Sequence, residues 1–276
     1  MSRNLLLHGE HQDTPAVTHL TASLAFARAS LLLAFTVAMV VCAPPAYAGA
    51  PFVTDDPQPT EVGHFEIDLG AQYAKRQGGR SGAVPSLEVD YGALPNLELQ
   101  IVAAFGFDRD TGSNTKFGVG DTEFGAKYRF IEEDKEGWRP AVAAAPQIFI
   151  PTGNERRGLG TGHTHYFLPI WLGKEFGEWT TFGGGGYLVG PGAGNKNAWF
   201  IGSGATRKIT EDLTVGGELF HLTASQTGRK STTVFNFAGI YDFTDNHHLL
   251  VSAGRGIQNA TTTNQFIGFI AYQLTF

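Results

Sequence analysis

Residues 121–130 of this 276-residue chain, D-T-E-F-G-A-K-Y-R-F, alternate between two kinds of side chain. Threonine, alanine and aromatic residues occupy the even-numbered positions, whereas four of the five odd-numbered positions are charged. Successive side chains point to opposite faces of a β-strand, so this period of two predicts a strand with one apolar and one charged face. In a soluble sheet the charged face would be solvated. In a transmembrane barrel it would line the lumen while the aromatic face meets lipid.

Similar segments recur along the chain, at lengths close to the ~9–11 residues that a tilted transmembrane β-strand needs. We expect twelve strands, at residues 62–75, 84–91, 96–107, 120–131, 138–150, 165–176, 179–189, 198–207, 213–223, 232–242, 248–256 and 264–276. Merging or splitting the four strands between 138 and 207 would give ten or fourteen instead. The chain has 36 glycines and only 17% charged residues, against about 25% charged on average, which agrees with an all-β membrane protein.

The connections between these strands alternate in length. Short turns follow the even-numbered strands, and mostly longer loops rich in Gly, Asn, Thr and Ser follow the odd-numbered ones, beginning with 76–83. Bacterial outer-membrane barrels have an even strand number, short periplasmic turns and longer outer loops. The sequence therefore predicts a transmembrane antiparallel up-and-down β-barrel of about twelve strands, with both ends of the barrel on the periplasmic side.

The N-terminal region has the pattern of a secretory signal. Arg28 precedes an apolar run over residues 29–43, and Ala46-Tyr47-Ala48 matches the small-x-small cleavage rule. We expect residues 1–48 to be a cleaved signal peptide, residues 49–61 an extended periplasmic lead, and residues 62–276 the barrel of a Gram-negative outer membrane. An uncleaved helical anchor is the alternative, and the two prolines that directly follow the run count against it.

Cysteine content and charge exclude several classes of function. Cys42 is the only cysteine and precedes the expected cleavage site, so the mature chain would have no disulfide, thiolate metal site or cysteine nucleophile. The formal net charge is −6, and no basic patch stands out, so nucleic acid is not an expected partner.

The alternation assigns charged side chains to the lumen. The candidate lumen-lining residues are Glu66, Asp68, Glu88, Asp90, Glu98, Lys127, Arg129 and Arg139. We expect the acidic members, from the first three strands, to face the basic members across the lumen, with Glu98 and Arg129 paired near the periplasmic rim. These groups would either form a constriction that orients polar groups of a solute, or form salt bridges that merely fill the barrel.

Other candidate sites are weaker. Asp55 and Asp56 are adjacent and would diverge in an extended chain, and His163 and His165 lack a third metal ligand nearby. A hydrolase site would need a nucleophile and a base within hydrogen-bond reach. The best pair, His221 and Ser252, lies two predicted strands apart. We predict no catalytic residue, metal or cofactor. Arg156 and Arg157 in an outer loop are candidates for lipopolysaccharide phosphates.

Several motifs resemble one family of outer-membrane proteins. They are P-F-V-T-D-D-P at 51–57, G-V-G-D-T-E-F-G-A-K-Y-R-F at 118–130, F-G-G-G-G-Y at 182–187, G-G-E-L-F-H at 216–221 and the terminal Y-Q-L-T-F. The chain is similar to the transporter family named for the meta-pathway of phenol degradation. The resemblance implies a monomeric barrel that passes small apolar or aromatic compounds.

These observations together predict a porin-like channel for passive transport of small molecules, without enzymatic activity. The alternatives are a structural or surface-interaction barrel and, after it, an outer-membrane hydrolase. The expected partners are a small-molecule solute, outer-membrane lipid and lipopolysaccharide. The barrel-assembly machinery is a further expected partner, through the last strand, which ends at Phe276.

Overall fold

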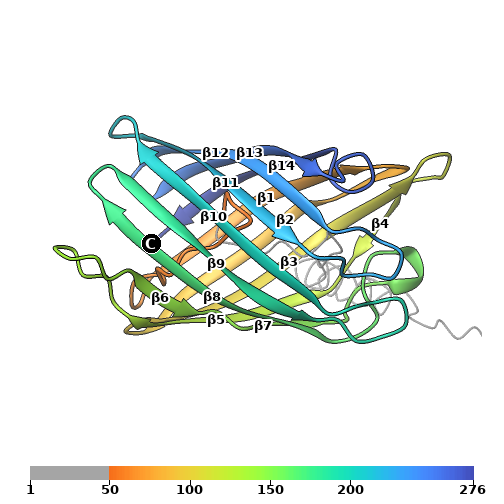
Figure 1. The fold of residues 1–276 in the computed structure, drawn as a ribbon, viewed down its shortest axis with the longest axis horizontal. Coiled ribbons are helices and arrows are strands. Elements are labelled where there is room, and N and C mark those ends of the chain that lie inside the picture. Colours follow the sequence, from red (N-terminus) through yellow and green to blue (C-terminus); the bar gives the residue numbers. More distant parts are fainter. Residues whose placement is uncertain (1–49) are drawn as a thin grey trace, which may run out of the picture. The chain divides into compact units, whose positions relative to one another are not determined.

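A computed structural model describes residues 50–276 as one antiparallel β-barrel (Figure 1). The predicted signal peptide and its cleavage site lie outside the described residues. The strands are β1 (Phe65–Arg76), β2 (Gly79–Leu94), β3 (Leu97–Asp110), β4 (Lys116–Val119), β5 (Thr122–Ile131), β6 (Ala141–Ala144), β7 (Gln147–Ile150), β8 (His165–Phe176), β9 (Trp179–Val189), β10 (Ala198–Lys208), β11 (Leu213–Leu222), β12 (Thr232–Thr244), β13 (His247–Gln258) and β14 (Phe266–Thr275). One short 3₁₀ helix, η1 (Glu155–Arg157), interrupts a long loop.

The sheet closes on itself, because β1 pairs with both β2 and β14. Two of the fourteen strand segments are continuations of their neighbours. β4 and β5 both pair with β3, and β6 and β7 both pair with β5 and β8, so the barrel wall has twelve strands. The break between β6 and β7 contains Pro146, which has no N–H to donate to the ladder. The predicted fold class and strand number are therefore confirmed.

The two faces of the wall differ as the alternation predicts. On β1, Leu69 is 54% exposed while its neighbour Asp68 is 6% exposed. The same contrast holds around the ring, where exposed apolar side chains on the outside include Leu99, Phe124, Ile170, Ile201, Leu219, Phe237 and Ile270. A continuous apolar outer surface is unfavourable in water and matches a lipid-facing band. Among residues 50–276 no helix is long and apolar enough to cross a membrane, a criterion that does not bear on strands.

Several predicted boundaries were wrong, and two of them show why. Residues 76–83 were expected to form a loop, but β1 and β2 are joined by the tight turn Gln77–Gly78, in which Gly78 adopts φ +78°. The first residues of β2 are small and have the composition of a loop, yet they pair with β1 on one side and with β3 on the other. The strand expected from residue 138 begins only at Ala141, because residues 132–140 form the connection from β5.

Candidate functional site

The charged side chains assigned to the lumen lie together on the inner face of β1, β2, β3 and β5. Asp68, Glu98 and Lys127 are 6%, 4% and 8% exposed, and Glu66, Glu88, Asp90 and Arg129 are half-buried. Their part in transport stays a prediction. Arg139 does not belong to this group. It is exposed in the β5–β6 connection and donates to the backbone oxygen of Glu132, because β6 starts after it.

Lys127 is the centre of a buried ion cluster. Its ammonium nitrogen lies 3.1 Å from the Asp55 carboxylate and 3.6 Å from the Glu98 carboxylate. Burial raises the pKa of Asp55, while the Lys127 ammonium opposes that rise. The cluster therefore joins a residue ahead of the first strand to two neighbouring strands of the wall.

The expected Glu98–Arg129 pair does not form. The strand register places Lys127, not Arg129, opposite Glu98. The Arg129 guanidinium instead donates to Asn96 Oδ1, at 3.1 Å from Nε and 2.7 Å from Nη2, and to Gln58. The basic side chains thus lie among the acidic ones, and the predicted opposition of an acidic and a basic side was wrong.

Four carboxylates face one another without a cation. In the β1–β2 register Glu66 lies opposite Asp90, and Asp68 lies opposite Glu88. We call these four residues the acidic wall. No ion pair joins any of them to a Lys, Arg or His in the described part of the chain. Like charges directly opposite each other destabilise a sheet, so the acidic wall is costly when all four groups are ionised.

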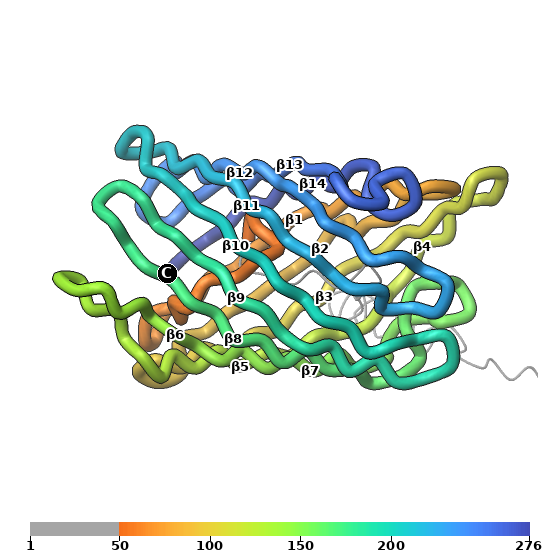
Figure 2. The backbone as a smooth tube through the Cα atoms, viewed as in Figure 1, coloured from red at the N-terminus to blue at the C-terminus, as the bar shows by residue number. Residues whose placement is uncertain are grey.

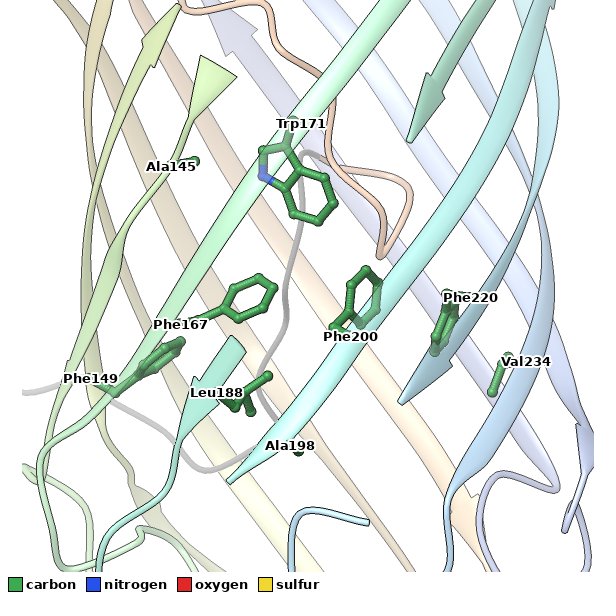
Figure 3. Close-up of a cluster of buried hydrophobic side chains, with 9 residues drawn as sticks. All are labelled: Ala145, Phe149, Phe167, Trp171, Leu188, Ala198, Phe200, Phe220 and Val234. Carbon is green, nitrogen blue, oxygen red and sulfur yellow. The ribbon is translucent and has the colours of Figure 1, made fainter. Parts of the chain in front are cut away.

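The inner face of β7 to β12 carries a cluster of apolar side chains that the sequence analysis did not predict. Figure 3 shows the side chains that form it, which we call the aromatic wall: Phe149, Phe167, Trp171, Leu188, Phe200, Phe220 and Val234. They are buried, and Phe167, Trp171 and Phe200 make edge-to-face contacts with one another at centroid distances of 6.0–6.2 Å. On β8 both faces are apolar, so alternation could not tell Phe167 and Trp171 from the outward Leu168 and Ile170.

One sequence signal did point to this wall. The glycine run 183–186 of β9 places bare backbone beside the large rings, because a Cβ at Gly184 would contact Trp171 and a Cβ at Gly186 would contact Phe167. The run therefore makes room for aromatic side chains inside the barrel.

Residues 50–61, which we call the lumen strap, run inside the barrel (orange in Figures 1 and 2). They were expected to be an extended periplasmic lead. Instead, the strap contacts strands from all around the ring: Thr60 N donates to Glu98 Oε2 on β3 at 2.8 Å, and the Phe52 ring lies 5.0 Å from that of Phe182 on β9. Two glycines of the barrel leave space for the strap, because a Cβ at Gly202 would overlap Thr54 and a Cβ at Gly173 would overlap Pro57.

Glu218 anchors the strap at the middle of β11. Its carboxylate accepts hydrogen bonds from Val53 N at 2.8 Å and Thr54 N at 2.7 Å, and from Asn236 Nδ2 at 2.9 Å. Glu218 is 4% exposed, so these three donors replace the water that the carboxylate loses. The strap has no regular periodicity, and its partners lie up to 165 residues away, so no local pattern could have predicted its position.

The described residues give little support to metal binding or hydrolysis. They contain no group of three or more His, Cys, Asp or Glu placed to hold a metal ion. His221 Nδ1 lies 2.8 Å from Thr233 Oγ1, whereas Ser252 lines an internal cavity whose lining does not include His221. Arg156 and Arg157 are exposed on η1, and their contact with lipopolysaccharide stays a prediction.

Comparison with known proteins agrees with the barrel. An outer membrane channel from Pseudomonas putida F1 has the same fold, with a TM-score of 0.64 and 17% identity over 80% of this chain and 98% of that one. The KdgM porin in complex with disordered oligogalacturonate follows with a TM-score of 0.50 and 12% identity, over 76% and 99% of the two chains. At these identities the likeness concerns the fold alone. No curated protein sequence matches the chain.

A family model covers the barrel almost from end to end. The family described as "Putative MetA-pathway of phenol degradation" matches residues 49–274, which include the strap and all but the end of the last strand. The resemblance noted in the motifs is thereby confirmed, and the chain belongs to this family of phenol-degradation MetA-pathway proteins.

Proposed function

We propose that this protein is a monomeric outer-membrane channel that lets small molecules, apolar or aromatic compounds among them, cross passively. The observation that carries the proposal is the contrast between the outer and the inner face of the barrel. An apolar outer band surrounds a lumen that combines charged side chains with the aromatic wall. A purely structural barrel has no need for unpaired carboxylates inside, whereas a channel uses such groups to attract and orient a solute.

The aromatic wall supports the choice of solute. Apolar side chains in a lumen lower the cost of desolvating an aromatic ring, and buried rings add favourable edge-to-face contacts. The outer-membrane channel and the porin that share this fold are consistent with transport on such a scaffold. We place the protein in the outer membrane, reached through the signal peptide, with lipid and lipopolysaccharide around it and insertion by the barrel-assembly machinery.

One observation favours the alternative of a closed barrel with a structural or surface-interaction role. The strap is pinned inside the lumen at Glu218 and at Lys127, so it obstructs part of the passage. In the transport proposal, the strap narrows the passage and selects against large solutes.

Planar-bilayer recording of the refolded mature chain tests the proposal. Discrete conductance steps are expected, and Arg129→Glu should shift the ion selectivity of these steps towards cations. Heat-dependent gel mobility must show that the same preparation is a folded barrel. A folded barrel that stays silent, both intact and without residues 50–58, would refute the channel and favour the structural role.

A further inference from the structure

A cavity of about 170 Å³ lies in the lumen beside the strap. Strap residues Pro51, Phe52 and Val53 form one side of it. The remaining apolar lining comes from the wall and includes Phe200, Phe220, Leu222, Ile267 and Phe269. An apolar cavity of about 150 Å³ takes up benzene in another protein, so this cavity has room for one six-membered ring.

The polar lining of the cavity combines amides and hydroxyls with one carboxyl group, that of Glu88. Glu88 is the one charged residue among the lining residues of the described chain, and its carboxylate accepts a single hydrogen bond, from Gln100 Nε2 at 2.7 Å. No lysine or arginine of residues 50–276 lines the cavity. A ligand N–H group that reaches Glu88 therefore meets a carboxyl acceptor without a competing Lys or Arg side chain.

The acidic wall increases this negative charge. Asp68 lies directly across from Glu88 in the β1–β2 register, and Asp90 lies two residues along β2 on the same face. Asp68 is 6% exposed, and its Oδ1 has no hydrogen-bond partner in the described structure. A cation bound at Glu88 would relieve the repulsion between these carboxylates.

A second, independent acceptor lines the cavity from β12. Asn236 is 1% exposed and lines the cavity. Its amide nitrogen donates to Glu218, which fixes the orientation of the side chain and leaves Oδ1 without a partner. A buried acceptor without a partner is costly, and a ligand N–H would satisfy it.

We propose that this cavity binds a small aromatic ammonium, with its ring among Phe52, Phe200, Phe220 and Phe269 and its N–H groups directed to Glu88 or Asn236. The aromatic faces add cation–π attraction that a neutral or anionic analogue lacks. An aromatic carboxylate of the same size would place a second anion beside Glu88. This inference rests on the proposed channel function, because it names the solute class that the lumen prefers.

Isothermal titration calorimetry of the mature barrel in a non-ionic detergent measures binding to the cavity independently of transport. The probes are 2-phenylethylammonium, 2-phenylethanol and 3-phenylpropionate, which share a ring and a short chain but differ in charge. We expect the ammonium to bind about ten-fold more tightly than the alcohol, because a hydrogen bond to a charged group is stronger than a neutral one. The carboxylate should bind most weakly.

The variant Glu88→Gln keeps an acceptor for Gln100 and removes the charge. It should abolish the preference for the ammonium over the alcohol. The matched control is Glu66→Gln, which removes a carboxylate of the acidic wall that does not line the cavity and should keep most of the preference. Phe220→Leu should weaken binding of the ammonium and the alcohol together, since it removes an aromatic ring from the lining.

Three results would overturn the assignment: equal affinity for the ammonium and the carboxylate, equal losses in Glu66→Gln and Glu88→Gln, or no saturable binding of any probe. Bilayer recordings separate these results from failure of the channel itself. A barrel that conducts ions but does not discriminate among the probes would retain the channel function and lose this site.

Discussion

At the scale of single residues, the Lys127 ammonium stabilises the carboxylates that are buried around it. Its ammonium is shared by Asp55 of the strap and Glu98 of β3, and all three side chains are at most 10% exposed. Replacing one partner of a buried ion pair leaves an uncompensated charge, which is strongly destabilising. The same reasoning explains why the strap and the wall are energetically coupled at this point.

We expect Lys127→Met to lower the free energy of unfolding by about 3–5 kcal/mol, because two buried carboxylates lose their cation. Urea titration of the barrel in lipid vesicles at pH 8 measures the change. The control is Arg207→Met, which removes a surface ion pair with Glu178 whose side chains are 46% and 67% exposed and should cost less than about 1 kcal/mol. A similar loss in both variants would contradict the assigned role of Lys127.

At the scale of elements, the strap depends on close approach to bare backbone. Thr54 sits where a side chain at Gly202 of β10 would be. The strap has no strand partner of its own, and it is held by side-chain contacts to several separate strands. Such a segment can be displaced while the hydrogen-bond ladder of the wall stays intact.

Gly202→Val should therefore displace the strap and increase single-channel conductance without loss of the folded barrel. The new side chain points inward and competes with Thr54 for the same space. Gly239→Val on β12 is the control, since a Cβ there has no atom closer than 3.8 Å. Unchanged conductance in a folded Gly202→Val barrel would mean that the strap does not limit the passage.

The pairing of β1 with β14 closes the barrel, and the last residue of the chain contributes to it. Phe276 and Phe65 exchange two backbone hydrogen bonds, at 2.7 and 3.0 Å, and their rings stack at a centroid distance of 5.5 Å. Deleting Phe276 removes both bonds and should cost about 1–3 kcal/mol of stability, with a lower yield of folded barrel in refolding assays. Phe276→Tyr retains the backbone bonds and the ring, so it should refold as the unaltered protein does.

At the scale of the whole molecule, the lumen carries an excess of negative charge. Besides Arg76 and its partners Asp108 and Asp110, the inner face of β1, β2, β3 and β5 holds six carboxylates and two cations: Glu66, Asp68, Glu88, Asp90, Glu98, Glu123, Lys127 and Arg129. A passage lined by one sign of charge concentrates ions of the opposite sign. The acidic wall should therefore decide which ions enter.

We expect the open channel to prefer cations, with a reversal potential of the corresponding sign in a potassium chloride gradient. The preference should shrink as the salt rises from about 0.1 to 1 M, because the screening length falls from about 10 to 3 Å. The double variant Glu66→Gln/Asp90→Asn should weaken it at low salt. Anion preference at 0.1 M salt would show that the acidic wall does not face the conducting path.

The strands and the direction of their side chains follow from local alternation in the sequence. Alternation with period two is a local property of the backbone, so it survives whatever the strand is paired with. It located β8 and β9 to the residue and assigned Asp68, Glu98 and Lys127 to the inner face. It failed where both faces are apolar, as around Trp171, because the lumen is then as apolar as the lipid side.

Which side chains contact one another inside the barrel depends on how the strands pair and how the ring closes. The pairing of Glu98 with Lys127 rather than Arg129 depends on strand register, and a shift of two residues changes every cross-strand partner while leaving the faces unchanged. The strap is held inside the lumen by Glu218 and Lys127, and two glycines without side chains leave space for it. These residues lie on strands that are distant in the sequence. Ring closure creates these contacts, and a local pattern of side chains contains no information about which strands the closed ring brings face to face.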